Sequence, residues 1–305
     1  MFVGHETLAF ALVALAATHL GRTNREALAL GVAAALFAAV PDVDMVYAPV
    51  GLLTVHSTDV FAATNAFWTA STAVHRSVTH SLVLAVPAAV AFALVARTDR
   101  RSLLAAPVLV ALVGVAAAAS GALGGVVMAV YVFAGTLVAY AAGRSLDISA
   151  RAVLVVALVG LLTHPFGDLF TGDAPRFLYP FAANLVEHRL GLFADPTLNL
   201  LSAFFAELTC IWLGVLTFLR LSDRDPLRAL NVRAAGGAAY ALAALVIAPP
   251  TFEASYQFVF SVLAVGFVGV VPNWERRLPD PATAAVTGLA AITIAGLAYT
   301  IVYIA

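Results

Sequence analysis

The sequence contains no lysine, only one cysteine and very few charged residues. Of its 305 residues, 11% are charged, all 16 basic residues are arginine, and the net charge is −1. Without an excess of basic residues the chain lacks the electrostatic footprint of a nucleic-acid-binding protein, so no DNA or RNA partner is expected. The single Cys210 cannot form an intrachain disulfide or, by itself, a thiolate metal site.

Two catalytic motifs are also missing. The sequence contains neither His-Glu-x-x-His, the motif of zinc proteases, nor Gly-x-Ser-x-Gly, the motif that carries a serine nucleophile. An intramembrane protease of either kind is therefore not expected.

Hydrophobic residues, in contrast, make up 62% of the chain, well above the roughly 45–50% of soluble domains. They predict an all-α fold, a polytopic transmembrane bundle of about ten helices. A full bilayer crossing needs about 20 residues, so the first two helices are short for a crossing. The predicted helices are Glu6–Leu20, Ala27–Val40, Thr79–Ala96, Leu103–Ala119, Leu123–Ala142, Ala152–Phe170, Leu198–Leu219, Ala234–Ile247, Tyr256–Val271 and Ala282–Ile304.

The arginines predict how the bundle is oriented. If all ten segments cross, 13 arginines fall on one side and only Arg76, Arg176 and Arg189 on the other. The positive-inside rule assigns the arginine-rich side to the cytoplasm. We therefore expect an integral multi-pass membrane protein with both termini outside the cytoplasm, together with two long polar loops at about 45–75 and 171–197.

Several histidines and acidic residues of the first 200 positions gather at four places. Because ionisable groups inside a membrane protein are costly, they are functional candidates. The arginine-based topology puts all four places at the outward face, although the positions of the histidines and aspartates were not used to derive it. They are His5; Asp42 and Asp44; His75, Arg76 and His80; and His164 and Asp168.

Imidazoles and carboxylates together suggest a divalent metal site, because they are the usual ligands of zinc, manganese or iron. His164 and Asp168 are four residues apart, so on a helix their side chains share one face. His75 and His80 are five apart, about 140° around a regular helix, so the helix must deviate if both bind. Asp42 and Asp44 leave two options open: one carboxylate bridges two metals, or one binds metal and the other acts as a base.

Arg76 is predicted to point into the same site, because it lies four residues before His80. A guanidinium there would suit a phosphate or a carboxylate through paired hydrogen bonds. Thr79 and Ser81 are candidates for hydrogen bonds that orient the imidazoles.

Three motifs, Pro41-Asp42-Val43-Asp44, His75-Arg76-Ser77-Val78-Thr79-His80-Ser81 and His164-Pro165-Phe166-Gly167-Asp168, together with His5, resemble those of the YdjM-like family of membrane-bound metal-dependent hydrolases. The resemblance covers roughly residues 1–200 and implies metal ligands at His5, Asp42, His75, His80, His164 and Asp168, with Asp44 as ligand or base. The family is itself distantly similar to zinc-dependent phospholipase C and P1-type nucleases. This relation implies a phosphoester substrate and a phosphate contact at Arg76.

We therefore expect residues 1–200 to form a membrane-embedded metal-dependent hydrolase core, and residues 201–305 to add scaffold helices. One or two ions, zinc or alternatively manganese, would activate a water against a phosphoester or lipid-like substrate at the outward face. The competing hypothesis is a metal- or proton-coupled transporter, which would need polar residues that continue through the membrane to the arginine-rich side. The lipid bilayer is the expected partner, and the sequence does not specify an oligomeric state.

Overall fold

A computed structural model describes residues 3–56, 58–71, 76–272 and 277–305, and all regular secondary structure in these residues is helical. The predicted all-α class is therefore confirmed. The chain divides into two compact units, Met1–Arg189 and Leu190–Ala305.

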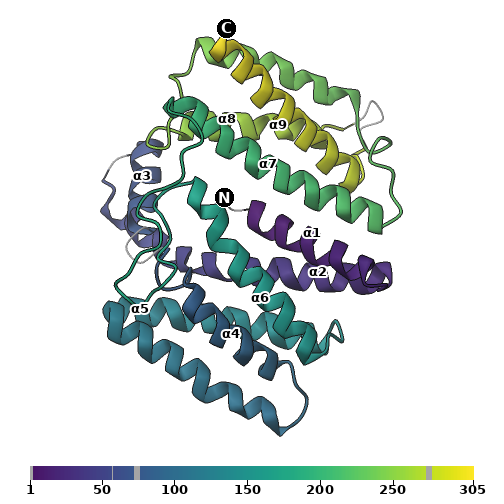
Figure 1. Ribbon diagram of the computed structural model, residues 1–305. Coiled ribbons are helices and arrows are strands. Elements are labelled where there is room, and N and C mark those ends of the chain that lie inside the picture. The colour runs from purple at the N-terminus through teal and green to yellow at the C-terminus, as the bar shows by residue number, and fades with distance from the viewer. Residues whose placement is uncertain (1–2, 57, 72–75, 273–276) are drawn as a thin grey trace. The chain divides into compact units, whose positions relative to one another are not determined.

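The first unit contains the short helices predicted at the amino terminus and the histidine-bearing segments (Figure 1). Its elements are α1 (Val3–His19), α2 (Asn24–Ala39), η1 (Pro41–Thr54), α3 (Val60–Ser71), α4 (Leu82–Val95), η2 (Arg100–Leu104), α5 (Ala105–Arg144), α6 (Ala150–Gly167) and η3 (Asp168–Phe170), where η marks a 3-10 helix.

Helices α1 and α2 form a hairpin whose turn is encoded locally. Gly21 has a φ of 78° at the turn, a conformation that glycine adopts without steric cost. Thr23 then caps α2: its hydroxyl accepts the N–H of Glu26, and the Glu26 carboxylate accepts the N–H of Thr23 in return. This reciprocal capping box fixes where α2 begins.

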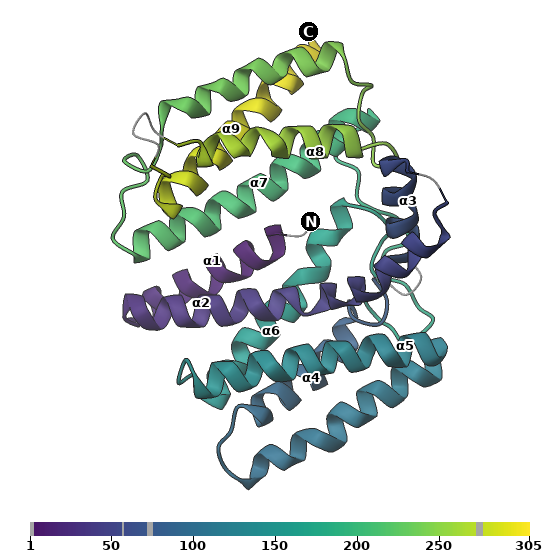
Figure 2. The same cartoon turned by 180° about the vertical axis from the view of Figure 1, so that it is seen from behind.

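The long element α5 is itself a hairpin. Its helical conformation is interrupted at Ser120 and at Gly121, which has a φ of 67°, and the chain doubles back there, so that the two halves run side by side (Figure 2). The two helices predicted at Leu103–Ala119 and Leu123–Ala142 are confirmed, with the break between them.

Most of the segment predicted as a loop at about 45–75 is helical in the structure, so this prediction is wrong there. Both η1 and α3 lie in this range and pack against each other so closely that a Cβ on Gly51 would lie 2.1 Å from the Ala66 carbonyl oxygen. The Asn and Thr residues of α3 resemble a loop in composition, but one face of this short helix packs on η1. The helix predicted from Thr79 begins later, at Leu82, because the Ser81 hydroxyl accepts the N–H groups of Val83 and Leu84.

The second unit has an aromatic and aliphatic core. Phe258 and Tyr299 pack edge to face with ring centroids 5.0 Å apart, and Leu200, Leu201 and Val262 are buried with them. Trp212 Nε1 donates to Thr293 Oγ1 at 3.0 Å and ties α7 to α9. The elements are α7 (Pro196–Leu221), η4 (Val232–Leu245), α8 (Tyr256–Ala264), η5 (Val265–Val270) and α9 (Pro281–Ile304).

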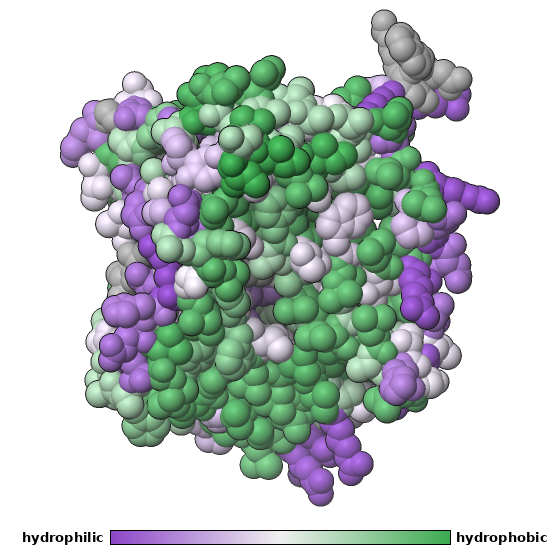
Figure 3. All heavy atoms as spheres, turned by 45° about the horizontal axis from the view of Figure 1, so that its top comes forward, coloured by the Kyte–Doolittle hydropathy of each residue, from purple (hydrophilic) through white to green (hydrophobic). Residues whose placement is uncertain are grey.

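The protein is a membrane protein by its helix lengths and by its surface. Among the residues that the structure describes, five helical stretches are long and apolar enough to cross a bilayer: Asn24–Thr54, Arg100–Arg144, Ala150–Phe170, Pro196–Leu221 and Pro281–Ile304. Figure 3 shows a face largely covered by hydrophobic residues, with hydrophilic residues gathered toward its margins. Such an apolar surface suits contact with lipid chains.

Candidate metal centre

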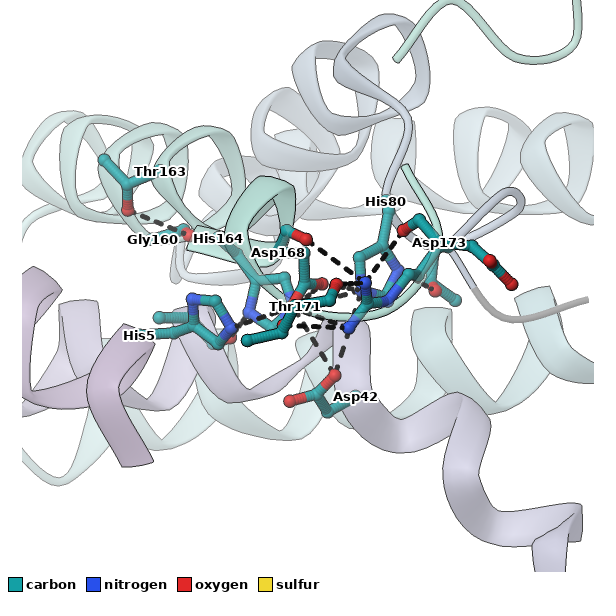
Figure 4. A network of polar contacts seen from close by, with 12 residues as sticks. His5, Asp42, His80, Gly160, Thr163, His164, Asp168, Thr171 and Asp173 are labelled. Atoms are coloured by element: carbon teal, nitrogen blue, oxygen red, sulfur yellow. Dashed lines mark hydrogen bonds and ion pairs between the residues drawn. The ribbon is translucent and has the colours of Figure 1, made fainter. Parts of the chain in front are cut away.

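Five of the predicted ligands converge in the first unit (Figure 4). His5 comes from the first turn of α1, Asp42 from the start of η1, and His80 from the segment before α4. His164 lies in the last turn of α6, and Asp168 opens η3 directly after it. His80 and His164 have no exposed surface, His5 and Asp168 have almost none, and the Asp42 side chain, at 17%, is the most exposed of the five.

The side-chain nitrogens and oxygens of these residues face one another. Asp168 Oδ1 lies 3.3 Å from His5 Nε2, and Asp168 Oδ2 lies 3.0 Å from His80 Nε2. His164 Nε2 lies 3.1 Å from His80 Nε2 and 3.4 Å from Asp42 Oδ1. His164 therefore stands at the centre of the cluster, between two carboxylates and a second imidazole.

Backbone packing determines how the His164 ring is oriented. Its Nδ1 lies 2.7 Å from the Ala38 carbonyl oxygen, which can only accept, so Nδ1 carries a proton, and in the neutral imidazole Nε2 presents a lone pair to the cluster. This bond requires α6 to lie very close to α2. At Gly160 a Cβ would come within 2.7 Å of the Ala34 oxygen, so glycine permits the approach.

A positive centre is needed where these groups meet. His164 Nε2 and the oxygens of Asp42 and Asp168 are all acceptors, and His80 Nε2 faces them. Their electron pairs repel unless a proton on one of the two Nε2 atoms or a metal cation lies between them. Thr79 Oγ1 lies 2.9 Å from His80 Nδ1, and with the Nδ1–H donated to this hydroxyl, His80 Nε2 would also present a lone pair.

The donor set fits a divalent cation. Two overlapping groups have ligand atoms within 4.8 Å of one another: His5, His164 and Asp168, and Asp42, His80 and His164. Because the groups share His164, the arrangement suits either one ion or a close pair. Three imidazoles with two carboxylates are a ligand set for zinc or manganese, and the cluster is therefore able to bind a metal ion.

The Arg76 side chain makes its hydrogen bonds with the segment after α6. Its Nη1 donates to the carbonyl oxygens of Asp168, at 3.1 Å, of Thr171, and of Asp173, at 2.8 Å. Its Nη2 donates to Asp168 Oδ1 at 3.2 Å. Arg76 thus reaches the cluster, as predicted, but not through helical spacing to His80, because Arg76 has a φ of 61° and lies in a turn.

Two of the predicted site residues cannot be placed. His75 lies outside the described residues, and so does the side chain of Asp44, whose backbone belongs to η1. Their predicted roles, as metal ligand and as ligand or base, stay predictions.

The sequence interpretation missed Glu6. Its Oε2 is buried without a hydrogen-bond partner in the described part of the chain, and its charge interacts with those of Asp42 and His164. A carboxylate in an apolar helix, next to a candidate ligand, was a signal in the sequence, since such groups are costly to bury.

The comparison with known families agrees with the resemblance that the motifs carry. The family model described as YdjM inner membrane protein matches residues 1–275, well beyond the roughly 200 residues over which the motifs were recognised. No curated protein and no solved structure matches the chain.

Proposed function

The chain belongs to the YdjM inner membrane protein family, and from this membership and its buried histidine–aspartate cluster we propose that it is a membrane-bound metal-dependent hydrolase. The proposed substrate is a phosphoester or lipid-like molecule, and the proposed ions are one or two zinc or manganese ions.

The observation that carries the proposal is the meeting of His80 Nε2, His164 Nε2 and two carboxylate groups at 3.0–3.8 Å in a site with almost no exposed surface. Burying five ionisable side chains costs free energy that packing alone does not require. A cation that binds all of them would offset this cost.

The chain's own residues divide the work. His5, His80, His164 and Asp168 would hold the ion, with His164 oriented by Ala38 and Asp168 held by Arg76. A divalent ion bound there supplies Lewis-acid chemistry, since it lowers the pKa of a water and polarises a phosphoryl oxygen. Asp42, the most exposed carboxylate of the cluster, is the group best placed to orient that water and accept its proton, a role that Asp44 could share.

The distribution of buried polar groups supports an enzyme over a transporter. In the described residues of the first unit, the fully buried polar side chains are His5, Thr79, His80, Ser81, His164 and Asp168, which all belong to the cluster or to the segment that carries His80. A transporter would need a continuation of polar groups along the helices. The confinement of these side chains to one cluster therefore favours a reaction at a single site over transport through the bundle.

The test is hydrolysis by the full-length protein reconstituted in lipid nanodiscs with added zinc or manganese. Substrates are a chromogenic phosphodiester, a chromogenic phosphomonoester and a phospholipid. We expect metal-dependent release from at least one of them, lost in His5→Ala and kept in His19→Ala, because His19 is exposed at the opposite end of the same helix. Equal activity in the two variants, or no metal-dependent turnover of any phosphoester or lipid, would contradict the proposal.

A further inference from the structure

The second unit contains a polar cavity far in sequence from the histidine cluster. It has a volume of about 200 Å³ and is lined by Asn231, Arg233, Gly269, Arg277, Thr283 and Thr287, among others. These residues come from the starts of η4 and α9, and from η5. A drug-sized ligand needs roughly 300 Å³ or more, so this cavity suits a small group.

The cavity is positively charged. Arg233 Nη1 donates to the Val271 carbonyl at 2.5 Å, which holds the guanidinium in place, and the other N–H groups of Arg233 have no partner among the described residues. Arg277 lines the same space from the chain before α9. Two guanidinium groups that line one small cavity suit the oxygens of a phosphate group.

Asp280, an acidic residue close to the cavity in sequence, already has its own hydrogen-bond partners. Asp280 caps α9 by accepting the N–H groups of Ala282 and Thr283, and its Oδ2 accepts the Thr283 hydroxyl at 2.6 Å. Arg224 lies 3.4 Å from its Oδ1. The Thr283 hydroxyl bond lowers the pKa of Asp280, so this carboxylate stays charged and paired with its own partners.

Apolar side chains flank the cavity and stay exposed. Leu278 lines the cavity and is 73% exposed, and Val232 and Phe267, each next in the chain to a lining residue, are 86% and 72% exposed. Free inorganic phosphate has no apolar part that could cover these side chains. A phospholipid does, because its acyl chains would cover the apolar side chains while its phosphate enters the cavity.

We propose that this cavity binds the phosphate group of an anionic phospholipid, with Arg233 and Arg277 as the charged contacts. Free inorganic phosphate offers the same oxygens to the two arginines. The exposed apolar side chains around the cavity favour a phospholipid as the molecule that supplies the phosphate group. The site lies in the arginine-rich loops that the sequence predicts to be cytoplasmic, where anionic lipids meet basic pockets. It serves as a lipid anchor for the second unit and does not depend on the hydrolase proposal.

The test is native mass spectrometry of the full-length protein released from nanodiscs that contain equal amounts of phosphatidylglycerol and phosphatidylcholine. Wild type should retain phosphatidylglycerol preferentially, and Arg233→Gln/Arg277→Gln should lower this preference about tenfold, the effect of losing charge-assisted hydrogen bonds. Arg220→Gln/Arg228→Gln is the matched control: it removes the same charge from exposed arginines of the second unit and should retain the preference.

Arg277→Gln alone covers the case in which the double variant fails to fold, because Arg277 is exposed and its loss leaves the helix packing intact. It should lower the preference in the same direction. A second arm repeats the mass spectrometry of the wild type after inorganic phosphate is added at the same concentration as phosphatidylglycerol, which should leave the lipid bound. Undiminished phosphatidylglycerol retention in both cavity variants would overturn the site, and inorganic phosphate that displaces the lipid at equal concentration would overturn the lipid as its source.

Discussion

The two units differ in the kind of polar side chain that they bury. The first unit buries three histidines and an aspartate with their polar atoms facing one another, whereas the fully buried polar side chains described in the second unit are Thr197, Thr217 and Thr287. A threonine in an apolar helix satisfies its hydroxyl with a nearby backbone carbonyl, so it needs no ligand. The imidazoles and carboxylates of the first unit cannot be satisfied so locally, and for this reason the proposed metal site lies in the first unit.

Asp168→Asn should have the largest effect on stability and on metal retention. It removes a carboxylate from two histidines and from Arg76, which leaves a buried cation without its partner at a cost of about 3–5 kcal/mol. Thermal unfolding in detergent measures the loss, and metal retention should fall with it.

Asp195→Asn is the matched change in the second unit. Asp195 caps α7 and accepts the Tyr303 hydroxyl, and asparagine is as good a cap as aspartate. It should keep both the melting temperature and the bound metal. An equal loss of stability in the two variants would remove the distinction between the units.

Arg76→Lys should weaken metal binding by about 10–100-fold, the usual effect of losing a group that holds a ligand in place. Lysine cannot reproduce the forked contacts that Arg76 makes with Asp168 and with the carbonyl groups of Thr171 and Asp173. Isothermal titration with zinc measures the change. If metal affinity stays at the wild-type value while KM for a phosphoester rises, Arg76 contacts substrate instead.

Gly160→Ala should destabilise the protein by about 1–3 kcal/mol, because the added methyl group overpacks the contact between α6 and α2. It should also weaken metal binding, since it pushes His164 Nδ1 away from the Ala38 carbonyl. Gly237→Ala makes the corresponding clash in the second unit, where its Cβ would lie 2.3 Å from the Ala291 oxygen. It should lower the melting temperature without changing metal affinity, and a loss of metal in both variants would contradict the assignment.

Thr79→Val should have the smallest effect, about tenfold in metal affinity, because it removes the hydroxyl beside His80 Nδ1 but keeps the shape of the side chain. Thr79→Ser keeps the hydroxyl and should retain most of the affinity. The two variants are compared by zinc titration, and an identical loss in both would assign the effect to packing.

Hydrophobic runs were sufficient to predict the helices, because a long apolar segment in a membrane protein has few alternatives to helix. They could not predict α3, whose Asn and Thr residues resemble a loop until η1 is known to pack on it. The turn at Gly21 and the capping box at Thr23 were readable locally.

The site was predictable as a set of residues but not as an arrangement. His164 and Asp168 come together because they are adjacent on one helical turn. The position of Arg76 depends on carbonyl groups about 100 residues later in the chain, and no local pattern specifies it. Glu6 was missed because it begins an apolar run, where its charge was read as part of a helix end.

Metal content of the detergent-purified wild-type protein, measured by elemental mass spectrometry, tests the central claim most directly. It is compared with His164→Ala/Asp168→Ala, after both proteins are shown to be folded. The account predicts one or two zinc or manganese ions per chain in the wild type and none in the variant. A wild-type protein that binds no divalent ion, even after reconstitution with zinc and manganese, would contradict it and assign the positive centre of the cluster to a proton on the His80–His164 pair.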